Sequence, residues 1–475
     1  MSDVLTVSGA GTTNPSKFIW KLMDLFEEEA RIPIRMTYRA VGSSTGMAEF
    51  KGVDGTTPLN DFGAGDIPIK QSIWSDIKGA GGESLQVPFV VGAISIFHSI
   101  PGVPDGKRGL NMTGCLLSKI FQRNITTWDD DEILAINPEL KALSPGVASQ
   151  NIRVVHRVKG SSSTSGTTTY LEKSCPDTWV LGAGSTVDWP ADTEGAQGSG
   201  GVSAYIAANE YAIGYLDSGH GRSEGFAEVE LKNKEGVYLS SAEADIGAAA
   251  TQALLAGVLP MTGTTPNPTA DWSSVDLYDM PGATTWPITM FSYFYLRKDM
   301  SASGQAGQLV KAFVQHCLSE EGQEMITEFG FSKVPQEVLD YNSYTLTNEL
   351  VVSGTPFEEE KVTATRAMDG AGDYVLSRKR RSYGEYERSK LEARIAALEA
   401  EVEFHHAEEE VHEAMHEHSH ESSVDSKDVD AALALGATSL VVSVLALGVA
   451  VAAYCKKPEA APMLGGNTAK PAAQV

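Results

Sequence analysis

The chain has 475 residues, 42% hydrophobic and 21% charged, which is long enough to build two or three compact units with cores of their own. Its formal net charge of -25 argues against nucleic acid as a partner, because a phosphate backbone binds a basic surface. Residues 385–430 contain 15 acidic and 4 basic residues, so nearly half of the excess negative charge lies in one segment. The rest of the chain is mildly acidic.

The first 70 residues repeat one pattern, in which a short strand is followed by a loop rich in glycine and hydroxyl residues and then by a helix. The loop 9–16 leads into an amphipathic helix at Lys17–Arg31. A second strand, Ile34–Val41, is followed by GSSTG at 42–46 and another helix, and a third short strand ends at Asp66. This alternation is typical of βαβ units, whose ligands bind at the ends of the strands.

Two apolar segments, Val87–Phe97 and Trp286–Leu296, read as buried strands. We expect them to cross between two α/β lobes, so that the returning chain completes the first lobe and a ligand cleft lies between the two. The expected division of residues 1–350 is a first lobe of about 1–90 plus 285–350 and a second lobe of about 91–284.

The elements expected between and after these strands are shorter or less regular. Helices are expected at Leu116–Phe121 and Asp129–Ile136, the latter capped by Thr127 or Asp129, and a loop at Gly182–Gly201. One long helix is expected at Gly307–Phe329, and regular signals fade beyond Pro335.

The segment Val154–Leu171 reads VVHRVKGSSSTSGTTTYL. An apolar strand leads to Arg157, and hydroxyl residues then fill nearly every position at the start of a helix. Free backbone amides, the positive end of the helix dipole, hydroxyl groups and a guanidinium together favour an oxyanion. A capped helix behind a serine-rich loop is the plainer alternative.

Three other segments are expected to converge on the same cleft, with Thr13 and Asn14, Ser43, and Asp66. An aspartate repels a fully ionised anion but accepts a hydrogen bond from a protonated one, so Asp66 would select phosphate over sulfate. Its alternative role is that of a helix cap.

The sequence Gly42–Gly46 also fits the G-x-S-x-G pattern of serine hydrolases, with Ser44 as the nucleophile. His220 and His316 are the histidines placed late enough to complete a triad. Because the pattern is short, we keep the hydrolase as an alternative only.

From about Leu5 to Leu339 the chain resembles the PstS-type periplasmic phosphate-binding proteins of bacterial phosphate ABC transporters. The resemblance rests on motifs in the family's order: GAGTTNP at Gly9, YRAVGSSTG at Tyr38, DFGAGDIP at Asp61, PFVVGAI at Pro88, TWDDDEI at Thr127, INPEL at Ile136, SQNIRVV at Ser149, RVKGSS at Arg157, GSTVDWP at Gly184, AIGYLD at Ala212 and WPITM at Trp286. It implies an α/β, two-lobed type II periplasmic-binding-protein (Venus flytrap) fold that binds phosphate without catalysis.

Matched residue by residue, the resemblance implies that the oxyanion is held by Thr13, the Asn14 backbone, Ser43, Asp66, Arg157, Ser161, Ser162 and Ser163. Asn14 stands where the family commonly has an aromatic, which leaves the backbone contact intact. Lys159 stands where the family has an acidic residue that pairs with the arginine. The lysine leaves Arg157 more available, which would strengthen anion binding and weaken selectivity, unless its side chain points into solvent.

The C-terminal part is expected to hold four segments: a linker at 351–384 with the basic cluster Arg378–Arg381, an acidic, histidine-rich helical stalk at 385–428, a transmembrane helix at 431–454 and a short cytosolic tail at 455–475. Residues 431–454 carry no charge and are long enough to span a bilayer. Lysines follow this segment directly, which places the C-terminus in the cytosol and the binding body outside the cell or in a lumen.

Two features of the stalk are open to more than one interpretation. Leu391, Ile395, Leu398 and Val402 have coiled-coil spacing over only two heptads, so a single charged helix is favoured. His412 and His416 share a helical face that could take a divalent metal, but a solvated stalk is favoured because no apolar shell would fix the ligands.

The four cysteines, Cys115, Cys175, Cys317 and Cys455, have neither CxxC nor metal-ligand spacing. They predict no disulfide framework, although one bridge among the first three stays open. The N-terminus MSDVLTVSGAG lacks the charged and apolar regions of a secretory signal, so either the start is incomplete or the anchor inserts the other way round.

The sequence therefore predicts a membrane-tethered solute-binding protein that captures inorganic phosphate for uptake or sensing. No cofactor and no metal site are expected, and the expected partner besides phosphate and the membrane is a permease or receptor. The alternatives are the serine hydrolase and a surface structural or adhesion protein on the same fold.

Overall fold

The computed structural model describes residues 4–103, 109–143, 146–358, 387–400 and 402. It divides into two units, Met1–Arg380 and Arg381–Val475. In the second unit the described residues are helical, and Leu391, Ile395, Leu398 and Val402 are exposed on that helix. Within the described ranges, no helix has the length and apolar character needed to cross a bilayer. The expected transmembrane segment, the stalk histidines, the basic cluster and the cytosolic tail all lie outside these ranges.

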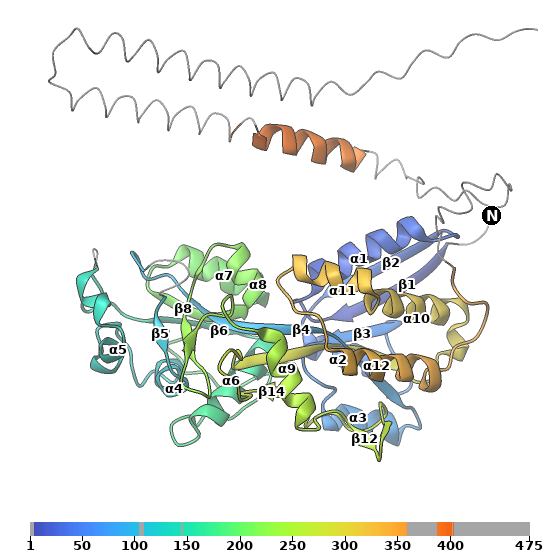
Figure 1. Cartoon of the computed structure of the whole chain (residues 1–475), viewed down its shortest axis with the longest axis horizontal. Helices are drawn as coiled ribbons and strands as arrows, with labels where there is room; N and C mark the ends of the chain where they lie inside the picture. Colours follow the sequence, from blue (N-terminus) through green and yellow to red (C-terminus); the bar gives the residue numbers. More distant parts are fainter. Residues whose placement is uncertain (1–3, 104–108, 144–145, 359–386, 401, 403–475) are drawn as a thin grey trace, which may run out of the picture. The chain divides into compact units, whose positions relative to one another are not determined.

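The first unit contains a mixed sheet in the order β2-β1-β3-β15-β4 (Figure 1). These strands are β2 (Ile34–Ala40), β1 (Leu5–Gly11), β3 (Phe62–Gly65), β15 (Ile288–Arg297) and β4 (Ser84–His98). β1 runs parallel to β2 and β3, whereas β15 is antiparallel to β3 and β4. The short strand β14 (Leu277–Tyr278) pairs with the start of β15. The strand that returns from far along the chain therefore lies in the middle of this sheet.

β4 continues beyond this sheet into a second one. It pairs with β15 from Ser84 to Ala93 and with β8 from Ile94 to His98. The second sheet runs β4-β8-β6-β7, with β8 (Ala212–Asp217), β6 (Arg153–Arg157) and β7 (Glu194–Ala196), and β9 (Ala227–Glu228) also pairs with β4. The two apolar segments of the sequence are thus confirmed as strands, and β4 joins two sheets, each with its own layer of helices.

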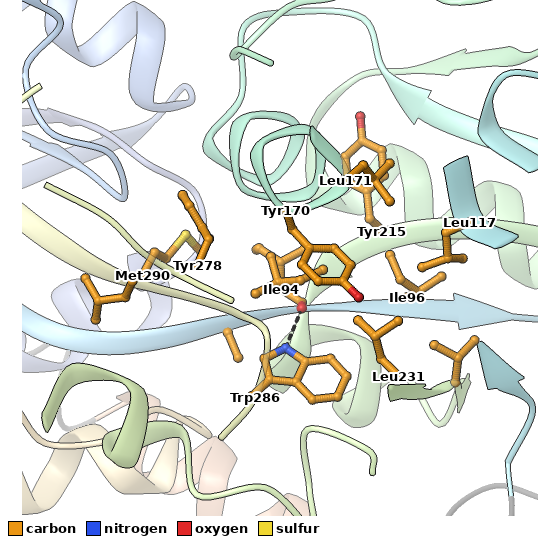
Figure 2. Packing of buried hydrophobic residues seen from close by; sticks show 14 of the residues in the cluster. Ile94, Ile96, Leu117, Tyr170, Leu171, Tyr215, Leu231, Tyr278, Trp286 and Met290 are labelled. Atoms are coloured by element: carbon orange, nitrogen blue, oxygen red, sulfur yellow. Dashed lines mark hydrogen bonds between the residues drawn. The ribbon is translucent and has the colours of Figure 1, made fainter. Parts of the chain in front are cut away.

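A hydrogen bond links β4 to a residue just before β15 at the point where β4 stops pairing with β15 and begins to pair with β8. Trp286, which precedes β15, donates its indole Nε1–H to the carbonyl oxygen of Ile94 at 2.8 Å (Figure 2). Trp286, Ile94 and Tyr215 are fully buried in one cluster of apolar side chains. A well-packed tryptophan contributes both apolar area and one fixed hydrogen bond, so it holds the backbone firmly at this point.

Helices cover both faces of the first sheet. α1 (Ser16–Glu29), α10 (Gln305–Cys317) and α11 (Glu320–Glu328) share one apolar cluster with β1, while α2 (Ser43–Lys51), α3 (Gln71–Gly79) and α12 (Gln336–Tyr344) pack into the other. α1 buries Phe18, Leu22 and Phe26 at helical spacing. With helices packed on both faces, a ligand site is expected at the ends of the strands.

The remaining elements are short. The helices are α4 (Gly114–Phe121), α5 (Asp131–Ile136), α6 (Ser162–Ser174), α7 (Gly198–Ala208), α8 (Ser218–Ser223), α9 (Ile246–Leu255) and the 3-10 helices Pro138–Ala142 and Ser301–Ser303. A π-helical turn, Thr345–Glu349, follows α12. The short strands are β5 (Asn111–Met112), β10 (Glu230–Lys232), β11 (Tyr238–Leu239), β12 (Met261–Thr262) and β13 (Thr265–Pro266).

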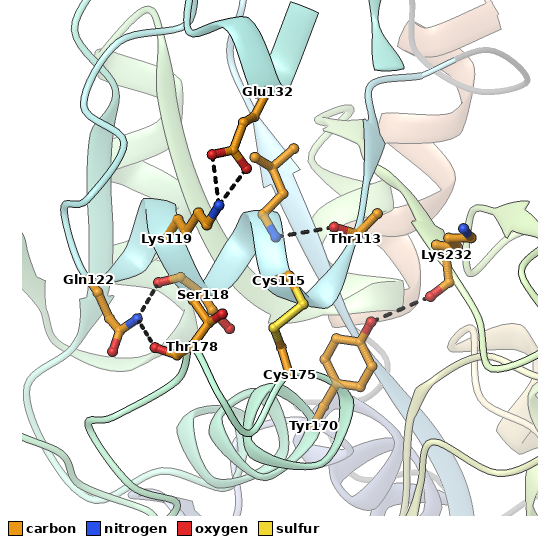
Figure 3. Close-up of a disulfide and its surroundings, with 11 residues drawn as sticks. Thr113, Cys115, Ser118, Lys119, Gln122, Glu132, Tyr170, Cys175, Thr178 and Lys232 are labelled. Atoms are coloured by element: carbon orange, nitrogen blue, oxygen red, sulfur yellow. Dashed lines mark hydrogen bonds and ion pairs between the residues drawn. A yellow bond between two sulfur atoms is a disulfide. The ribbon is translucent and has the colours of Figure 1, made fainter. Parts of the chain in front are cut away.

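A disulfide joins Cys115 on α4 to Cys175 at the end of α6 (Figure 3). The open question about one bridge is thus answered, and Cys317 is a buried free thiol. The bridge closes a loop of 60 residues and holds α6 against α4.

Four expectations about local structure are wrong. The predicted long helix Gly307–Phe329 is interrupted, because Ser319 caps a new helix through its bond from Gly322 N. α5 is capped by Asp130 rather than by Thr127 or Asp129. The predicted loop Gly182–Gly201 contains β7 and the start of α7. Pro335 is the N-cap residue of α12, so regular structure continues beyond it.

Candidate functional site

Asp66 follows β3 and is the centre of a hydrogen-bonded cluster, with 1% of its surface exposed. Its Oδ2 accepts hydrogen bonds from Thr12 Oγ1, from Asn14 Nδ2 at 2.9 Å and from Ser162 Oγ at 2.7 Å. Its Oδ1 accepts one from Ser292 Oγ at 2.7 Å. Ser162 belongs to the second sheet's helix layer, so the cluster connects the two sheets.

The environment of Asp66 changes its acidity in two directions. Burial raises the pKa of its carboxyl, while the hydrogen bonds from Thr12, Ser162 and Ser292 and the charge of Arg157 lower it, and the net pKa is above the ordinary value. The Asp66 backbone N–H donates to Ser43 Oγ at 3.3 Å. The aspartate is therefore a strong acceptor held in place from several sides.

Arg157 ends β6 and is 7% exposed. Its backbone N–H donates to Tyr215 Oη at 3.1 Å, and its Nη1 makes a long contact of 3.5 Å with Ser199 Oγ. Within the described ranges its Nε is buried without a hydrogen-bond partner. Burial lowers the pKa of the guanidinium, although an arginine remains charged in any protein. Such a buried cation with an unused donor is suited to an anion that accepts several hydrogen bonds.

The guanidinium lies close to the loop that precedes α2. A Cβ added at Gly42, which has φ +93°, would lie 3.9 Å from Arg157 Nη2. Gly42 directly precedes Ser43 at the start of α2. A Cβ at Gly46 would lie only 2.4 Å from Gly11 Cα, so α2 packs directly on the end of β1 because no side chain intervenes.

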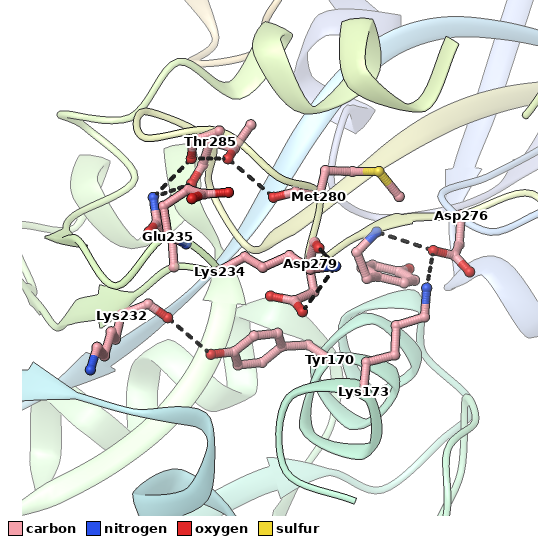
Figure 4. A network of polar contacts seen from close by, with 12 residues as sticks. Tyr170, Lys173, Lys232, Lys234, Glu235, Asp276, Asp279, Met280 and Thr285 are labelled. Carbon is pink, nitrogen blue, oxygen red and sulfur yellow. Dashed lines mark hydrogen bonds and ion pairs between the residues drawn. The ribbon is translucent and has the colours of Figure 1, made fainter. Parts of the chain in front are cut away.

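α6 brings its first turn to the same place. Ser161 is its N-cap and accepts a hydrogen bond from Ser163 N at 3.1 Å, whereas Ser163 Oγ is buried without a partner among the described residues. The helix has 13 residues, and its positive end adds to the charge of the guanidinium. At its other end Lys173 pairs with Asp276 at 2.6 Å (Figure 4), which fixes α6 to the segment leading to β15.

The loop between β1 and α1 supplies the remaining groups. Thr13 Oγ1 lies 3.4 Å from Ser199 Oγ, which in turn faces Arg157. The Asn14 backbone N–H donates to Thr12 Oγ1 at 3.2 Å, and its side-chain Oδ1 is buried without a partner in the described part of the chain. A lysine expected to modify this site, Lys159, is exposed.

The structure brings together most residues expected at the site, which are Thr13, Asn14, Ser43, Asp66, Arg157, Ser161, Ser162 and Ser163. It adds four that sequence reasoning missed, namely Thr12, Ser199, Tyr215 and Ser292. Ser292 had a signal, since it is the one serine inside the apolar run MFSYFYL. Ser199 was hidden in the segment expected to be a loop, and Tyr215 had no distinguishing signal.

The serine hydrolase receives no support from this geometry. Ser44 Oγ donates to Ser185 Oγ at 3.2 Å, and Lys70 Nζ donates to the same Ser185 Oγ at 2.8 Å. His220 Nε2 instead lies 3.3 Å from Ser203 Oγ, and the ring of His316 packs on Phe26. A triad needs a histidine within hydrogen-bond reach of the nucleophile.

Comparison with known proteins gives one family and one fold. Residues 2–321 match the family model described as the PBP superfamily domain. The chain is 29% identical over 336 residues to the phosphate-binding protein PstS of Haemophilus influenzae, covering 70% of this chain and 90% of that protein. It is 28% identical over 346 residues to the protein of the same name from Methanocaldococcus jannaschii, covering 70% and 84%.

Solved structures agree on the fold. A phosphate binding protein from Stenotrophomonas maltophilia has a TM-score of 0.54 at 17% identity and covers 74% of this chain and 100% of its own. A high affinity periplasmic phosphate-binding protein, PfluDING, has a TM-score of 0.51 at 18% identity with the same coverage. The chain therefore belongs to the PBP superfamily, with its two-lobed α/β periplasmic-binding-protein fold, and is similar to the PstS proteins within it.

Proposed function

We propose that the chain is a non-enzymatic solute-binding protein that captures inorganic phosphate between its two lobes. The observation that carries the proposal is the buried Arg157 guanidinium, whose Nε has no partner in the described part of the chain and which lies beside hydroxyl groups and the start of α6. Phosphate satisfies these donors with several acceptor oxygens. The similar proteins named PstS are phosphate-binding proteins.

The proposed ligand shell draws on both lobes, divided at about 1–90 plus 285–350 and 91–284. Arg157 supplies the charge and paired donors, and Asp66 accepts a hydrogen bond from the P–OH group that phosphate keeps at neutral pH. The other proposed contacts are Thr13, the Asn14 backbone, Ser43 and Ser161, Ser162 and Ser163. Thr12 and Ser292 would hold the Asp66 carboxylate in position through the hydrogen bonds that they donate to it.

Titration calorimetry of the full chain with phosphate, arsenate and sulfate tests the proposal. We expect heat from phosphate and arsenate, which share charge and protonation, and far weaker binding of sulfate, which has no proton for Asp66. No heat with phosphate would overturn the proposal. It would then leave a structural or adhesion protein on this fold as the better interpretation.

We also propose that residues 431–454 tether the binding unit to a membrane, with the unit extracellular or lumenal and the C-terminus cytosolic. The support is the uncharged length of this segment and the lysines that follow it. The proposed partner is a permease or a receptor that takes the captured phosphate for uptake or sensing. Alkaline carbonate extraction of membranes tests the anchor, because a peripheral protein would be released into the supernatant.

A further inference from the structure

Four asparagines in the chain stand in the N-x-S/T pattern, or sequon, that directs the attachment of an oligosaccharide to an asparagine side chain. Two of them, Asn14 and Asn267, are excluded because a proline stands between the asparagine and the hydroxyl residue. The remaining sequons are Asn111–Thr113 (NMT) and Asn124–Thr126 (NIT). They lie on either side of α4, and their surroundings differ.

The second sequon lies in the turn that follows α4. Asn124 and Thr126 are exposed, whereas Ile125 between them is 4% exposed. The backbone N–H groups of Asn124 and Ile125 both donate to the Lys119 carbonyl oxygen, at 2.8 and 3.2 Å. Thr126 also lines a surface groove of about 640 Å³. The turn is therefore held by its backbone and its buried isoleucine, and there is space beside it for an attached sugar.

The first sequon is tied into the fold. Asn111 lies in β5, which pairs with β10, and its Nδ2 donates to the Ile136 carbonyl oxygen at 3.3 Å. Its backbone N–H donates to Asn137 Oδ1 at 2.7 Å, and its carbonyl oxygen accepts from Asn137 Nδ2 at 3.0 Å. Thr113 is the N-cap of α4 and accepts a hydrogen bond from Leu116 N at 3.1 Å. A sugar on Asn111 would displace these contacts.

The disulfide beside these sequons indicates the compartment in which the unit folds. Cys115 on α4 is bonded to Cys175 (Figure 3), and disulfides form and persist in oxidising compartments such as the secretory lumen. Sequons are used in proteins that pass through this lumen. The inference rests on the proposed orientation, in which the unit is extracellular or lumenal, and it does not depend on phosphate binding.

The second sequon lies at the opposite end of α6 from the proposed phosphate contacts. The disulfide attaches α4 to the C-terminal end of α6, and Gln122 Nε2 at the end of α4 donates to the Thr178 carbonyl oxygen at 2.9 Å. Ser161–Ser163 are at the other end of this 13-residue helix, about 20 Å away at a rise of about 1.5 Å per residue. A glycan on Asn124 should therefore leave phosphate binding unchanged.

We propose that Asn124 carries an N-linked oligosaccharide and that Asn111 does not. The donor is an oligosaccharide joined through a diphosphate to a polyprenyl lipid. Asn124 Nδ2 forms a bond to C1 of the first sugar and loses one proton, while the bond from C1 to the diphosphate oxygen breaks and the lipid diphosphate leaves with the electron pair. Nothing is oxidised or reduced. Thr126 supplies the hydroxyl that the transferring enzyme requires.

The experiment uses the full chain isolated from its source cells. Peptide N-glycosidase removes an N-linked oligosaccharide and converts the modified asparagine to aspartate. The reaction is run in water labelled with heavy oxygen, so that spontaneous deamidation is not counted. Peptide mass mapping is expected to find conversion of Asn124 and none of Asn111. The full chain should move as one faster band in gel electrophoresis after the treatment.

Variants made through a eukaryotic secretory pathway assign the sequon. Asn124→Gln and Thr126→Ala should each abolish the band shift, whereas Thr126→Ser should keep it, because serine also completes the pattern. Thr126→Ala retains Asn124, so loss of the shift in both variants identifies the sequon rather than the asparagine side chain alone. Asn111→Gln is the matched control and should keep the shift.

The outcomes separate this inference from the proposed function. No conversion of Asn124 in the chain from its source cells overturns the inference, as does conversion of Asn111 or a shift that survives Asn124→Gln. In calorimetry Asn124→Gln should bind phosphate within about twofold of the glycosylated chain, as expected for a surface change away from the site. An unmodified chain that binds phosphate leaves the function standing without the inference. A chain glycosylated at Asn124 that gives no heat with phosphate overturns the function and leaves the inference standing.

Discussion

Ser162 Oγ at the start of α6 donates a hydrogen bond of 2.7 Å to Oδ2 of Asp66, which directly follows β3, so two segments 96 residues apart in the chain meet at this carboxylate. Ser162→Ala should weaken phosphate binding about 5- to 20-fold, because Asp66, a buried carboxylate, loses one of the hydrogen bonds that hold it beside the ligand. Ser165→Ala, on the same helix, is the control. Equal affinities of the two variants in calorimetry would show that this contact does not contribute to binding.

Arg157→Ala should weaken phosphate binding by about 2–5 kcal/mol, as expected when one partner of a buried charge pair is removed. Arg157→Lys should recover only part of the loss, because an ammonium group cannot offer two parallel donors. The matched control is Arg153→Ala on the same strand, since Arg153 is exposed and its Nη1 bonds to Asn209 Oδ1. A wild-type affinity for Arg157→Ala would place the arginine outside the ligand site.

Lys159→Asp tests how an exposed charge two residues from Arg157 affects the ligand. Because the lysine is exposed, we expect only a threefold to tenfold loss of phosphate affinity at low salt, and almost none at about 0.5 M salt, where such charges are screened. Calorimetry at the two salt concentrations measures this. A large loss that persists at high salt would mean that Lys159 touches the ligand directly.

Asp217→Asn should change how stability depends on pH. Burial raises the pKa of Asp217 from 3.8 to about 7, with the bond from His220 N and the charge of Arg222 opposing this rise and the charge of Asp66 adding to it. At pH values between 3.8 and about 7, the Asp217 carboxyl is protonated in the folded chain and ionised in the unfolded chain. Rising pH in this range therefore destabilises the folded wild type. The asparagine has no such proton.

The free energy of unfolding of Asp217→Asn minus that of the wild type should therefore increase by about 2–3 kcal/mol from pH 5 to pH 8. Denaturant titrations of both proteins at the two pH values measure it. The buried His98, whose pKa is lowered to about 4, titrates in both proteins and cancels in the difference. A constant difference would contradict the raised pKa of Asp217.

Replacing both Cys115 and Cys175 by alanine should lower the free energy of unfolding by about 4 kcal/mol, as expected from opening a loop of 60 residues in the unfolded chain. Denaturant titration measures the loss. A reducing agent should lower the stability of the wild type by a similar amount and leave the double variant unchanged. Equal sensitivity of both proteins to reduction would locate the effect elsewhere.

Much of the fold followed from local patterns. The apolar runs that became β4 and β15 were long enough to be buried strands, and hydroxyl residues after a strand marked the start of α6. The predicted helix boundaries were wrong where a single capping residue determines the boundary. Ser319, for example, caps the start of α11 within one continuous apolar pattern. A local pattern shows which face of a helix is buried, but it does not show where one helix stops and the next begins.

The sequence by itself determined which residue types gather at the strand ends, including Arg157 and Asp66, because strand, loop and helix each have a local period. Only the tertiary structure decided that Ser292 and Ser199 join them, and that Asp217 has one buried oxygen without a partner among the described residues. These side chains come from β15, α7 and the end of β8. Their hydrogen bonds depend on how two sheets that share β4 are placed, and no periodicity along the chain encodes that placement.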